Sequence, residues 1–274
     1  MKPVRVPDLR AMKERGEKIA VLTAYDYTMG RLLDRAGIDV ILVGDSAGMV
    51  VLGFDNTLPV TLDMMIHHTS AVSRGVKRAL IVADMPFLTF QLSLEETMRN
   101  AGRLVQEGGA AAVKIEGGRQ VAETARRLVD MGIPVMGHLG LTPQSVHQLG
   151  GFRPQGRDSE AAERLLKDAE VLEKAGAFAI VLESIPDDLA GRATNILKIP
   201  TIGIGAGTQC DGQVLVSHDM LGLTDNPPPF AKPYARLSDQ IVSAAHAYIE
   251  DVRGASPTRS ASAIARSPNE GRSR

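Results

Sequence analysis

Three acidic residues stand at the ends of three consecutive apolar segments. Asp45 follows DVILVG, Asp84 ends ALIVAD and Glu116 ends AAVKIE. Neighbouring parallel strands lie about 4.8 Å apart, so acids at their ends would converge and repel one another. Mg²⁺ prefers oxygen ligands and keeps several waters, whereas Zn²⁺ prefers a Cys and His cluster, which does not accompany these acids. We predict that Asp45, Asp84 and Glu116 hold Mg²⁺; the alternative is that they cap the helices after the strands.

Lys114 lies two residues before Glu116 in the same apolar segment. Because side chains alternate along a strand, both should face the same side, which is the interior of a barrel. A lysine is costly in apolar surroundings unless an anion accompanies it. Lys114 could therefore neutralise a substrate carboxylate or an enolate; the alternative is a structural ion pair with Glu116.

Two later apolar segments also end in residues that can move protons. Glu183 ends AFAIVLE, and its apolar neighbours make it a candidate general base with a raised pKa. His138 ends IPVMGH and could hydrogen-bond a substrate or a metal ligand. A purely structural role for His138 is an equal alternative.

Other motifs give weaker indications. GIGAG (203–207) follows a strand but lacks the register of a dinucleotide-binding loop, so we interpret it as a tight turn. The pair His67–His68 lies in a segment with helical spacing and is expected on a helix. His218 and Asp219 follow the last apolar segment and could reach an active-site mouth, without an assigned role.

Eight apolar, β-branched segments recur about every 28 residues, the length of a βα repeat. They are apolar throughout, as expected for strands that are covered on both faces. We therefore predict an α/β fold, a single TIM (β/α)₈ barrel. The expected strands are 19–24, 39–44, 79–84, 111–116, 133–138, 177–183, 199–205 and 213–218. The clearest expected helices are 28–37, 93–109, 122–132 and 159–176.

The remaining segments are assigned by composition. The N-terminal DLRAMKERGEK is expected to form a helix that covers the bottom of the barrel. Residues 46–61 are expected to form an active-site loop, and residues 141–158, rich in Gly, Pro and Gln, a lid. We place the catalytic domain at 1–253 and a disordered, mildly basic tail at 254–274, where hydrophobic periodicity is lost.

Composition excludes several classes of protein. A net charge of −1 offers no electrostatic basis for binding nucleic acid or an anionic membrane. Cys210 is the only cysteine, so a disulfide-built secreted scaffold is excluded and the cytoplasm is expected; no adjacent base marks Cys210 as a nucleophile. The N-terminal segment lacks the apolar region of a signal peptide, and no run of about 18 apolar residues could span a membrane.

From about residue 3 to 250 the sequence resembles the ketopantoate hydroxymethyltransferase family. The matching stretches are TAYDY (23–27), VGDSAGMVVLGFDNTLPVTLDMM (43–65), VADMPF (82–87), AAVKIEGG (111–118), VMGHLGLTPQSVHQLGG (135–151), VLESIP (181–186) and IGIGAGTQCDGQVLVSHDMLGL (202–223). Ser184 stands where many relatives carry Cys, which affects no catalytic position.

The resemblance implies roles for the residues already singled out. The metal would be Mg²⁺, held partly through water by Asp45, Asp84 and Glu116. Glu183 would be the catalytic base. Substrate contacts would come from Asp45, Ser46, Asp84 and Lys114.

The resemblance also implies the reaction and the assembly. The family transfers a hydroxymethyl group from 5,10-methylenetetrahydrofolate to 3-methyl-2-oxobutanoate, through an enolate stabilised by the metal and Lys114. The product, 2-dehydropantoate, is a precursor of pantothenate and coenzyme A. A cytoplasmic homo-oligomer, usually a decamer, is implied as well.

Two other functions remain as alternatives. One is a Mg²⁺-dependent 2-oxo acid lyase or mutase related to phosphoenolpyruvate mutase and isocitrate lyase. Those lyases typically carry a catalytic Cys on a mobile loop, and neither 46–60 nor 141–158 contains one. The other is a non-catalytic, ligand-binding barrel, which would have little use for three metal-directed acids and an interior lysine.

Overall fold

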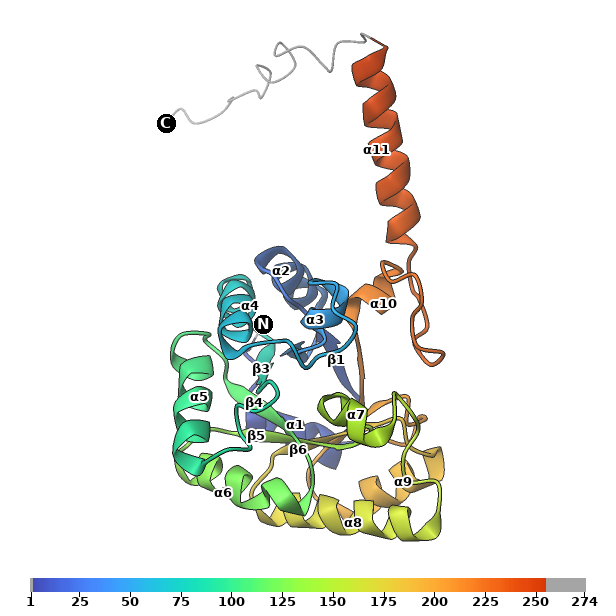
Figure 1. The fold of residues 1–274 in the computed structure, drawn as a ribbon. Helices are drawn as coiled ribbons and strands as arrows, with labels where there is room; N and C mark the ends of the chain where they lie inside the picture. The colour runs from blue at the N-terminus through green and yellow to red at the C-terminus, as the bar shows by residue number, and fades with distance from the viewer. Residues whose placement is uncertain (1, 255–274) are drawn as a thin grey trace, which may run out of the picture.

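Eight parallel strands close into a barrel in the computed structural model, which describes residues 2–254 (Figure 1). Each strand pairs with the next along the chain, and β8 pairs with β1. The strands are β1 Ile19–Thr23, β2 Val40–Val43, β3 Leu80–Asp84, β4 Ala112–Glu116, β5 Val135–Gly140, β6 Ala179–Glu183, β7 Thr201–Ile204 and β8 Gly212–Leu215. The predicted TIM barrel is confirmed, with a strand overlapping each of the eight expected segments. Two bounds were wrong: β5 continues past residue 138 to Gly140, and β8 ends at Leu215, so that Ser217 and His218 begin a helix.

Helices surround the barrel and cover its outer face. They are α2 Tyr27–Ala36, α4 Leu62–Gly75, α5 Leu94–Gln106, α6 Ala122–Asp130, α8 Ser159–Lys174 and α9 Asp187–Ile196. Four of them match the four expected helices, and His67 and His68 lie on α4 as predicted. Side-chain caps explain several starts: Asp26, Thr61, Ser93 and Asp158 each accept a hydrogen bond from a backbone N–H in the first turn of the following helix.

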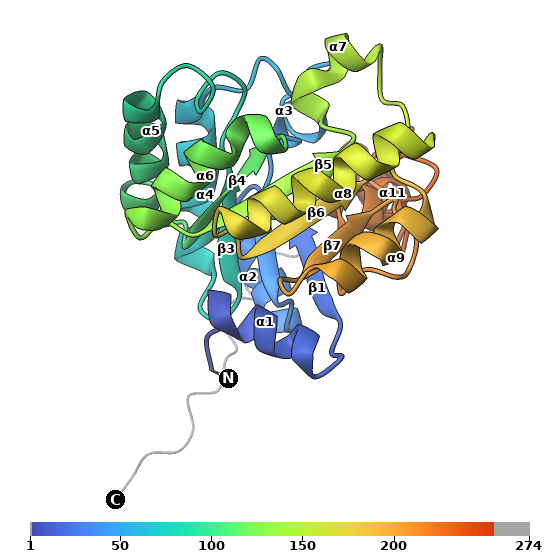
Figure 2. The same cartoon turned by 90° about the horizontal axis from the view of Figure 1, so that it is seen from below.

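Apolar side chains fill the interior of the barrel and seal its lower half. Inward-facing residues of all eight strands form one buried cluster, which includes Val21, Leu42, Val82 and Met136. Leu9 of α1 (Val6–Glu14) belongs to the same cluster and is completely buried. In Figure 2, α1 lies below one end of the strands, so the predicted helix across the bottom of the barrel is confirmed.

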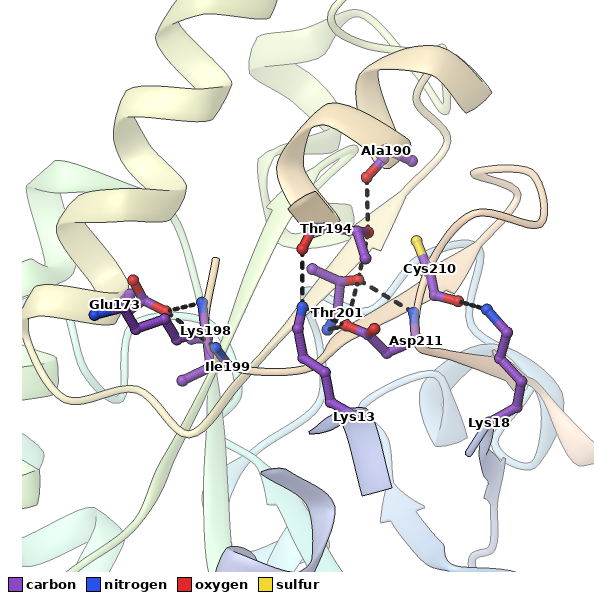
Figure 3. A network of polar contacts seen from close by, with 10 residues as sticks. All are labelled: Lys13, Lys18, Glu173, Ala190, Thr194, Lys198, Ile199, Thr201, Cys210 and Asp211. Carbon is purple, nitrogen blue, oxygen red and sulfur yellow. Dashed lines mark hydrogen bonds and ion pairs between the residues drawn. The ribbon is translucent and has the colours of Figure 1, made fainter. Parts of the chain in front are cut away.

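A polar network fastens α1 to the bottom of the barrel (Figure 3). Lys13 Nζ lies 2.8 Å from Asp211 Oδ2 and 2.8 Å from the carbonyl oxygen of Thr194. Asp211 also accepts a hydrogen bond of 2.9 Å from the backbone N–H of Thr201 at the start of β7. One lysine thereby ties α1 to α9 and to the connection between β7 and β8.

The two long loops at the opposite end contain short helices. Residues 46–61 include α3 (Ala47–Val50), and residues 141–158 include a 3₁₀ turn, η2 (Pro143–Ser145), followed by α7 (Val146–Leu149). Gly150, with φ of 69°, ends α7 in the left-handed conformation that glycine adopts readily. Figure 2 shows α3 and α7 beyond the end of the strands that is opposite α1.

The last described helix stands apart from the barrel. A short helix, α10 (Ser217–Leu221), follows β8, and α11 (Leu237–Arg253) then projects away from the barrel without a buried residue (Figure 1). Residues 255–274 of the predicted tail lie outside the described residues, so the tail and the boundary at 253 stay predictions. Between residues 2 and 254, no helix is long and apolar enough to cross a membrane.

Candidate active site

The three predicted acids meet at the carboxyl ends of β2, β3 and β4. Asp45, Asp84 and Glu116 are each less than a tenth exposed and line one cavity of about 1180 Å³. The backbone N–H of Asp45 donates to Asp84 Oδ2 over 3.1 Å. The geometry therefore brings together the cluster that the strand-end spacing predicted.

Lys114 lies inside this cluster, on the same inward face of β4 as Glu116. Its Nζ atom is 3.2 Å from Asp84 Oδ1 and 3.0 Å from His138 Nδ1. The structural ion pair weighed for Lys114 therefore has Asp84 as its partner instead of Glu116, because β3 and β4 place Asp84 and Lys114 side by side. Burial opposes the lysine's charge, but the charges of Asp84, Glu116 and Asp45 outweigh it and raise the pKa of Lys114.

One lysine does not neutralise three buried acids. Burial and the nearby charge of Asp84 raise the pKa of Asp45 to about 7. Burial also raises the pKa of Glu116 well above its usual range, although Lys114 opposes this. Within residues 2–254, the buried Glu116 Oε1 accepts no hydrogen bond, and Asp84 Oδ1 has only its ion pair with Lys114. The cluster therefore has oxygen atoms and negative charge available for a further cation.

The donor set fits a hard cation that retains water. Within residues 2–254, no three His, Cys, Asp or Glu side chains stand close enough together to hold a metal ion directly. Mg²⁺ usually binds through one or two carboxylates and several waters, so buried oxygens with free acceptor capacity suit it. The assignment of Asp45, Asp84 and Glu116 as ligands stays a prediction.

Gln144, at the start of the 141–158 loop, holds two of these carboxylates from above. Its Nε2 atom donates to Asp45 Oδ2 over 2.9 Å and to the carbonyl of Met85 over 3.0 Å. Its backbone N–H donates to Glu116 Oε2 over 3.0 Å. We did not predict this residue; its sequence signal was only that it lies in a loop rich in Gly, Pro and Gln.

Glu183 and His138 face each other across β5 and β6. His138 Nε2 is 3.1 Å from Glu183 Oε2, close enough for a hydrogen bond but without the alignment of one. Burial raises the pKa of Glu183 to about 7, and the charge of Lys114 opposes that rise. The raised pKa predicted for Glu183 is thus present, and its role as base stays a prediction.

Ser46, the remaining predicted substrate contact, lines the same cavity between β2 and α3. Its Oγ atom lies 2.9 Å from the hydroxyl of Tyr25, a buried residue that follows β1. The main chain of Tyr25 is held in turn, since its carbonyl lies 2.8 Å from His68 Nδ1. Tyr25 is a second residue that sequence reasoning missed, because an aromatic near a strand end resembles any core residue.

The structure also shows where the motifs without an assigned role lie. The 203–207 segment is a tight turn after β7, with φ of 59° at Gly205 and 75° at Gly207. Cys210 is buried, and burial raises the pKa of its thiol, which disfavours a nucleophilic role. His218 and Asp219 line the cavity, so they reach its mouth as expected.

The family model of ketopantoate hydroxymethyltransferase matches residues 3–258. The chain belongs to the ketopantoate hydroxymethyltransferase family. Two relatives, both named 3-methyl-2-oxobutanoate hydroxymethyltransferase, are each 59% identical to it. The protein of Syntrophus aciditrophicus matches over 89% of this chain and 90% of its own length, and that of Moorella thermoacetica over 91% and 93%. Ketopantoate hydroxymethyltransferase relatives thus match over nearly their whole length.

Solved structures with lower identity share the fold of this family member. Phosphoenolpyruvate phosphomutase from Streptomyces platensis superimposes with a TM-score of 0.62 at 16% identity, over 96% of this chain and 92% of its own. Phosphonopyruvate hydrolase, solved with oxalate and Mg²⁺, superimposes with a TM-score of 0.59 at 13% identity over the same shares. At these identities the likeness concerns the barrel alone.

Proposed function

We propose that this protein transfers a hydroxymethyl group from 5,10-methylenetetrahydrofolate to 3-methyl-2-oxobutanoate, giving 2-dehydropantoate. Family membership and the names of relatives at 59% identity support the reaction. The geometric observation that carries it is a single cavity that contains the buried acid cluster together with Lys114. On the other side of His138, the same cavity contains Glu183, whose pKa is raised to about 7. Proton removal beside a ketone needs such an arrangement.

Asp45, Asp84 and Glu116 would hold Mg²⁺. Their oxygen donors and the negative charge that Lys114 does not compensate both favour binding of this cation. When bound, the metal would supply Lewis-acid polarisation of the keto group of the substrate. Related folds support the assignment, since phosphonopyruvate hydrolase was solved with Mg²⁺ and oxalate, a small dicarboxylate.

Lys114 and Ser46 would bind and orient the keto acid. The ammonium of Lys114 is almost fully buried, so its attraction for a substrate anion is little screened. The Ser46 hydroxyl is fixed by Tyr25 and can reach a substrate oxygen with its remaining hydrogen-bonding capacity. These contacts would hold C3 of the keto acid toward Glu183.

Glu183 would remove the C3 proton. A carboxyl with a pKa near 7 is a stronger base than an exposed glutamate and is still substantially ionised at neutral pH. The electron pair left at C3 then forms a bond to the one-carbon unit as that carbon leaves the folate nitrogens. The C3 proton and one water proton end on those nitrogens, and the water oxygen becomes the new hydroxyl.

The test is a Mg²⁺-dependent assay with both substrates and the purified protein. We expect 2-dehydropantoate and tetrahydrofolate in equal amounts, together with exchange of the C3 hydrogen in D₂O. A protein that exchanges no C3 hydrogen and transfers no one-carbon unit does not have this function. Cleavage of a carbon–carbon or carbon–phosphorus bond in a 2-oxo acid would support the lyase or mutase alternative, with which the fold is shared.

We also propose that the protein acts as a homo-oligomer, a decamer by resemblance, in the cytoplasm. Among the eight described strands, only β1 and β8 contain an exposed residue. These residues are Ala20 in β1 and Gln213 in β8, which lie opposite each other where the two strands pair. Further along the chain, α11 exposes five large apolar or aromatic side chains that nothing in residues 2–254 covers: Ile241, Val242, Tyr248, Ile249 and Val252. A second copy that covers these surfaces would bury both.

Light scattering after size-exclusion chromatography tests the assembly. The full chain should elute as a closed oligomer, and a chain that ends at Arg236 should give smaller particles. A chain that ends at Gly254 is the matched control and should behave as the full chain does. A monomeric full chain would contradict the proposal.

A further inference from the structure

The cavity is larger than the keto acid requires. Its volume of about 1180 Å³ exceeds the roughly 300–1,000 Å³ that holds a drug-sized ligand. A five-carbon acid bound among Asp84, Lys114 and Glu183 would occupy only the floor. The upper part is therefore a separate subsite, and its chemistry can be examined by itself.

Apolar side chains from three connections line this upper part: Met49, Phe54, Phe152, Leu223, Pro228 and Phe230. Phe152 is 49% exposed and Phe230 is 38% exposed, a high fraction for aromatic residues that face a cavity. The ring of Phe230 packs against Gly205, where an added Cβ would lie 2.6 Å from Phe230 Cδ1. Such side chains can pack against the face of a ring, which leaves the ring's polar edge for polar residues of the cavity.

Asp219 is the acidic residue in the wall formed after β8, which also contains the polar residues His218, Thr224 and Asn226. It is 5% exposed and lines the cavity, yet its carboxylate accepts no hydrogen bond and forms no ion pair with any residue from 2 to 254. The neighbouring His218 does not balance its charge, because burial lowers the pKa of that imidazole, although Asp219 opposes this. Both carboxylate oxygens are therefore free to accept hydrogen bonds from a ligand in the cavity.

We propose that Asp219 binds the aminopyrimidine edge of the reduced folate, whose ring rests against the apolar upper wall. The ring N–H and the exocyclic amino group of a pterin present two parallel donors, which match the two oxygens of a carboxylate. Because β8 is four strands from β4 in the closed barrel, this anchor lies across the cavity mouth from Lys114 and Glu116. The inference rests on the proposed function, since it assigns a place to that reaction's second substrate.

Asp219→Asn tests the assignment, with Asp225→Asn as the matched control. Asp225 lies in the same connection but is exposed and does not line the cavity. We expect the Kd for tetrahydrofolate, measured by calorimetry, and the KM for methylenetetrahydrofolate to rise about 10- to 100-fold in Asp219→Asn, as for loss of a charge-assisted hydrogen bond. Both should stay within twofold of wild type in Asp225→Asn.

Exchange of the C3 hydrogen of the keto acid is the internal control, because this step needs no folate. Asp219→Asn should keep the wild-type exchange rate within about twofold, which also shows that the variant is folded. Phe230→Ala, which removes only a half-exposed ring, should likewise weaken tetrahydrofolate binding and leave exchange intact.

The results that would overturn the inference are distinct from failure of the proposed function. Unchanged folate binding in Asp219→Asn, or loss of exchange together with folate binding, would assign Asp219 elsewhere. If the wild-type protein binds tetrahydrofolate and Asp219→Asn does not, the folate subsite is supported even when no one-carbon transfer is detected. That combination of results would contradict only the proposed reaction.

Discussion

The Nζ atom of Lys114 lies 3.0 Å from Nδ1 of His138. An ammonium has only hydrogens to donate, so Nδ1 must accept and the ring proton of a neutral imidazole must sit on Nε2. Burial, reinforced by the charge of Lys114, lowers the pKa of His138 well below its usual range and keeps the ring neutral. The N–H of His138 is therefore on Nε2, 3.1 Å from Glu183 Oε2, and the imidazole ring lies between the Lys114 ammonium and the candidate base.

Replacing Glu183 with glutamine should abolish the base and keep the shape of the site. We expect the rate of C3 exchange in D₂O, followed by proton NMR, to fall about 10²- to 10⁴-fold, the usual contribution of general base catalysis. Binding of the keto acid should change little, because Lys114 and the acid cluster remain. An exchange rate within a few fold of wild type would assign the base to another residue.

The raised pKa of Glu183 predicts a particular pH dependence. Only the ionised carboxylate can accept a proton, so kcat/KM for the keto acid should be maximal above pH 7 and fall about tenfold per unit below it. An exposed glutamate would give the same decline near pH 4.5. A profile that stays flat between pH 5 and 8 would contradict this environment for Glu183.

Gln144 should control the affinity for Mg²⁺. Gln144→Leu removes the hydrogen bond to Asp45 but keeps the backbone N–H that binds Glu116. Loss of a partner that orients a metal ligand typically weakens metal binding about 10- to 100-fold. Calorimetric titration with Mg²⁺, in the absence of substrate, measures this directly.

Gln155→Leu is the matched control, since the Gln155 side chain donates only to the Arg153 carbonyl in the same loop. Equal Mg²⁺ affinity in wild type and Gln144→Leu would show that the amide does not position Asp45 for the metal.

Removing the interior cation should make folding depend on the metal. In Lys114→Met, Asp84 loses its ion pair and the three acids have no cation, which should cost about 3–5 kcal/mol in the free energy of unfolding. Mg²⁺ should restore more stability to this variant than to wild type. Urea denaturation with Mg²⁺ and with chelator gives both values, and an equal Mg²⁺ effect in the two proteins would refute the argument.

The positions of the acidic residues in the cavity could be predicted because a parallel barrel gathers all its strand ends at one face. Asp84, Glu116 and Glu183 each end a strand, so their convergence follows from topology whatever the loops do. Lys114 follows from the alternation of side chains along β4. The partner of Lys114 did not follow, because the register between β3 and β4, which sets Asp84 beside it, is a tertiary property.

Residues from loops escaped prediction for a physical reason. Gln144 reaches Asp45 only because η2 and α7 fold the connection after β5 back over the strand ends. No periodicity or spacing in the sequence predicts this contact between Gln144 and Asp45. Tyr25 acts through Ser46, which lies on another strand's loop, and such pairs need the assembled barrel.

The helix that seals the bottom of the barrel also constrains the order of events. Leu9 fills the lower end and Lys13 is fastened to Asp211, whereas residues of α3 line the cavity at the opposite end of the barrel. If the folate binds above the keto acid as proposed, both substrates enter from this end of the barrel. We then expect the keto acid to bind first and its product to leave last, which is an ordered kinetic sequence.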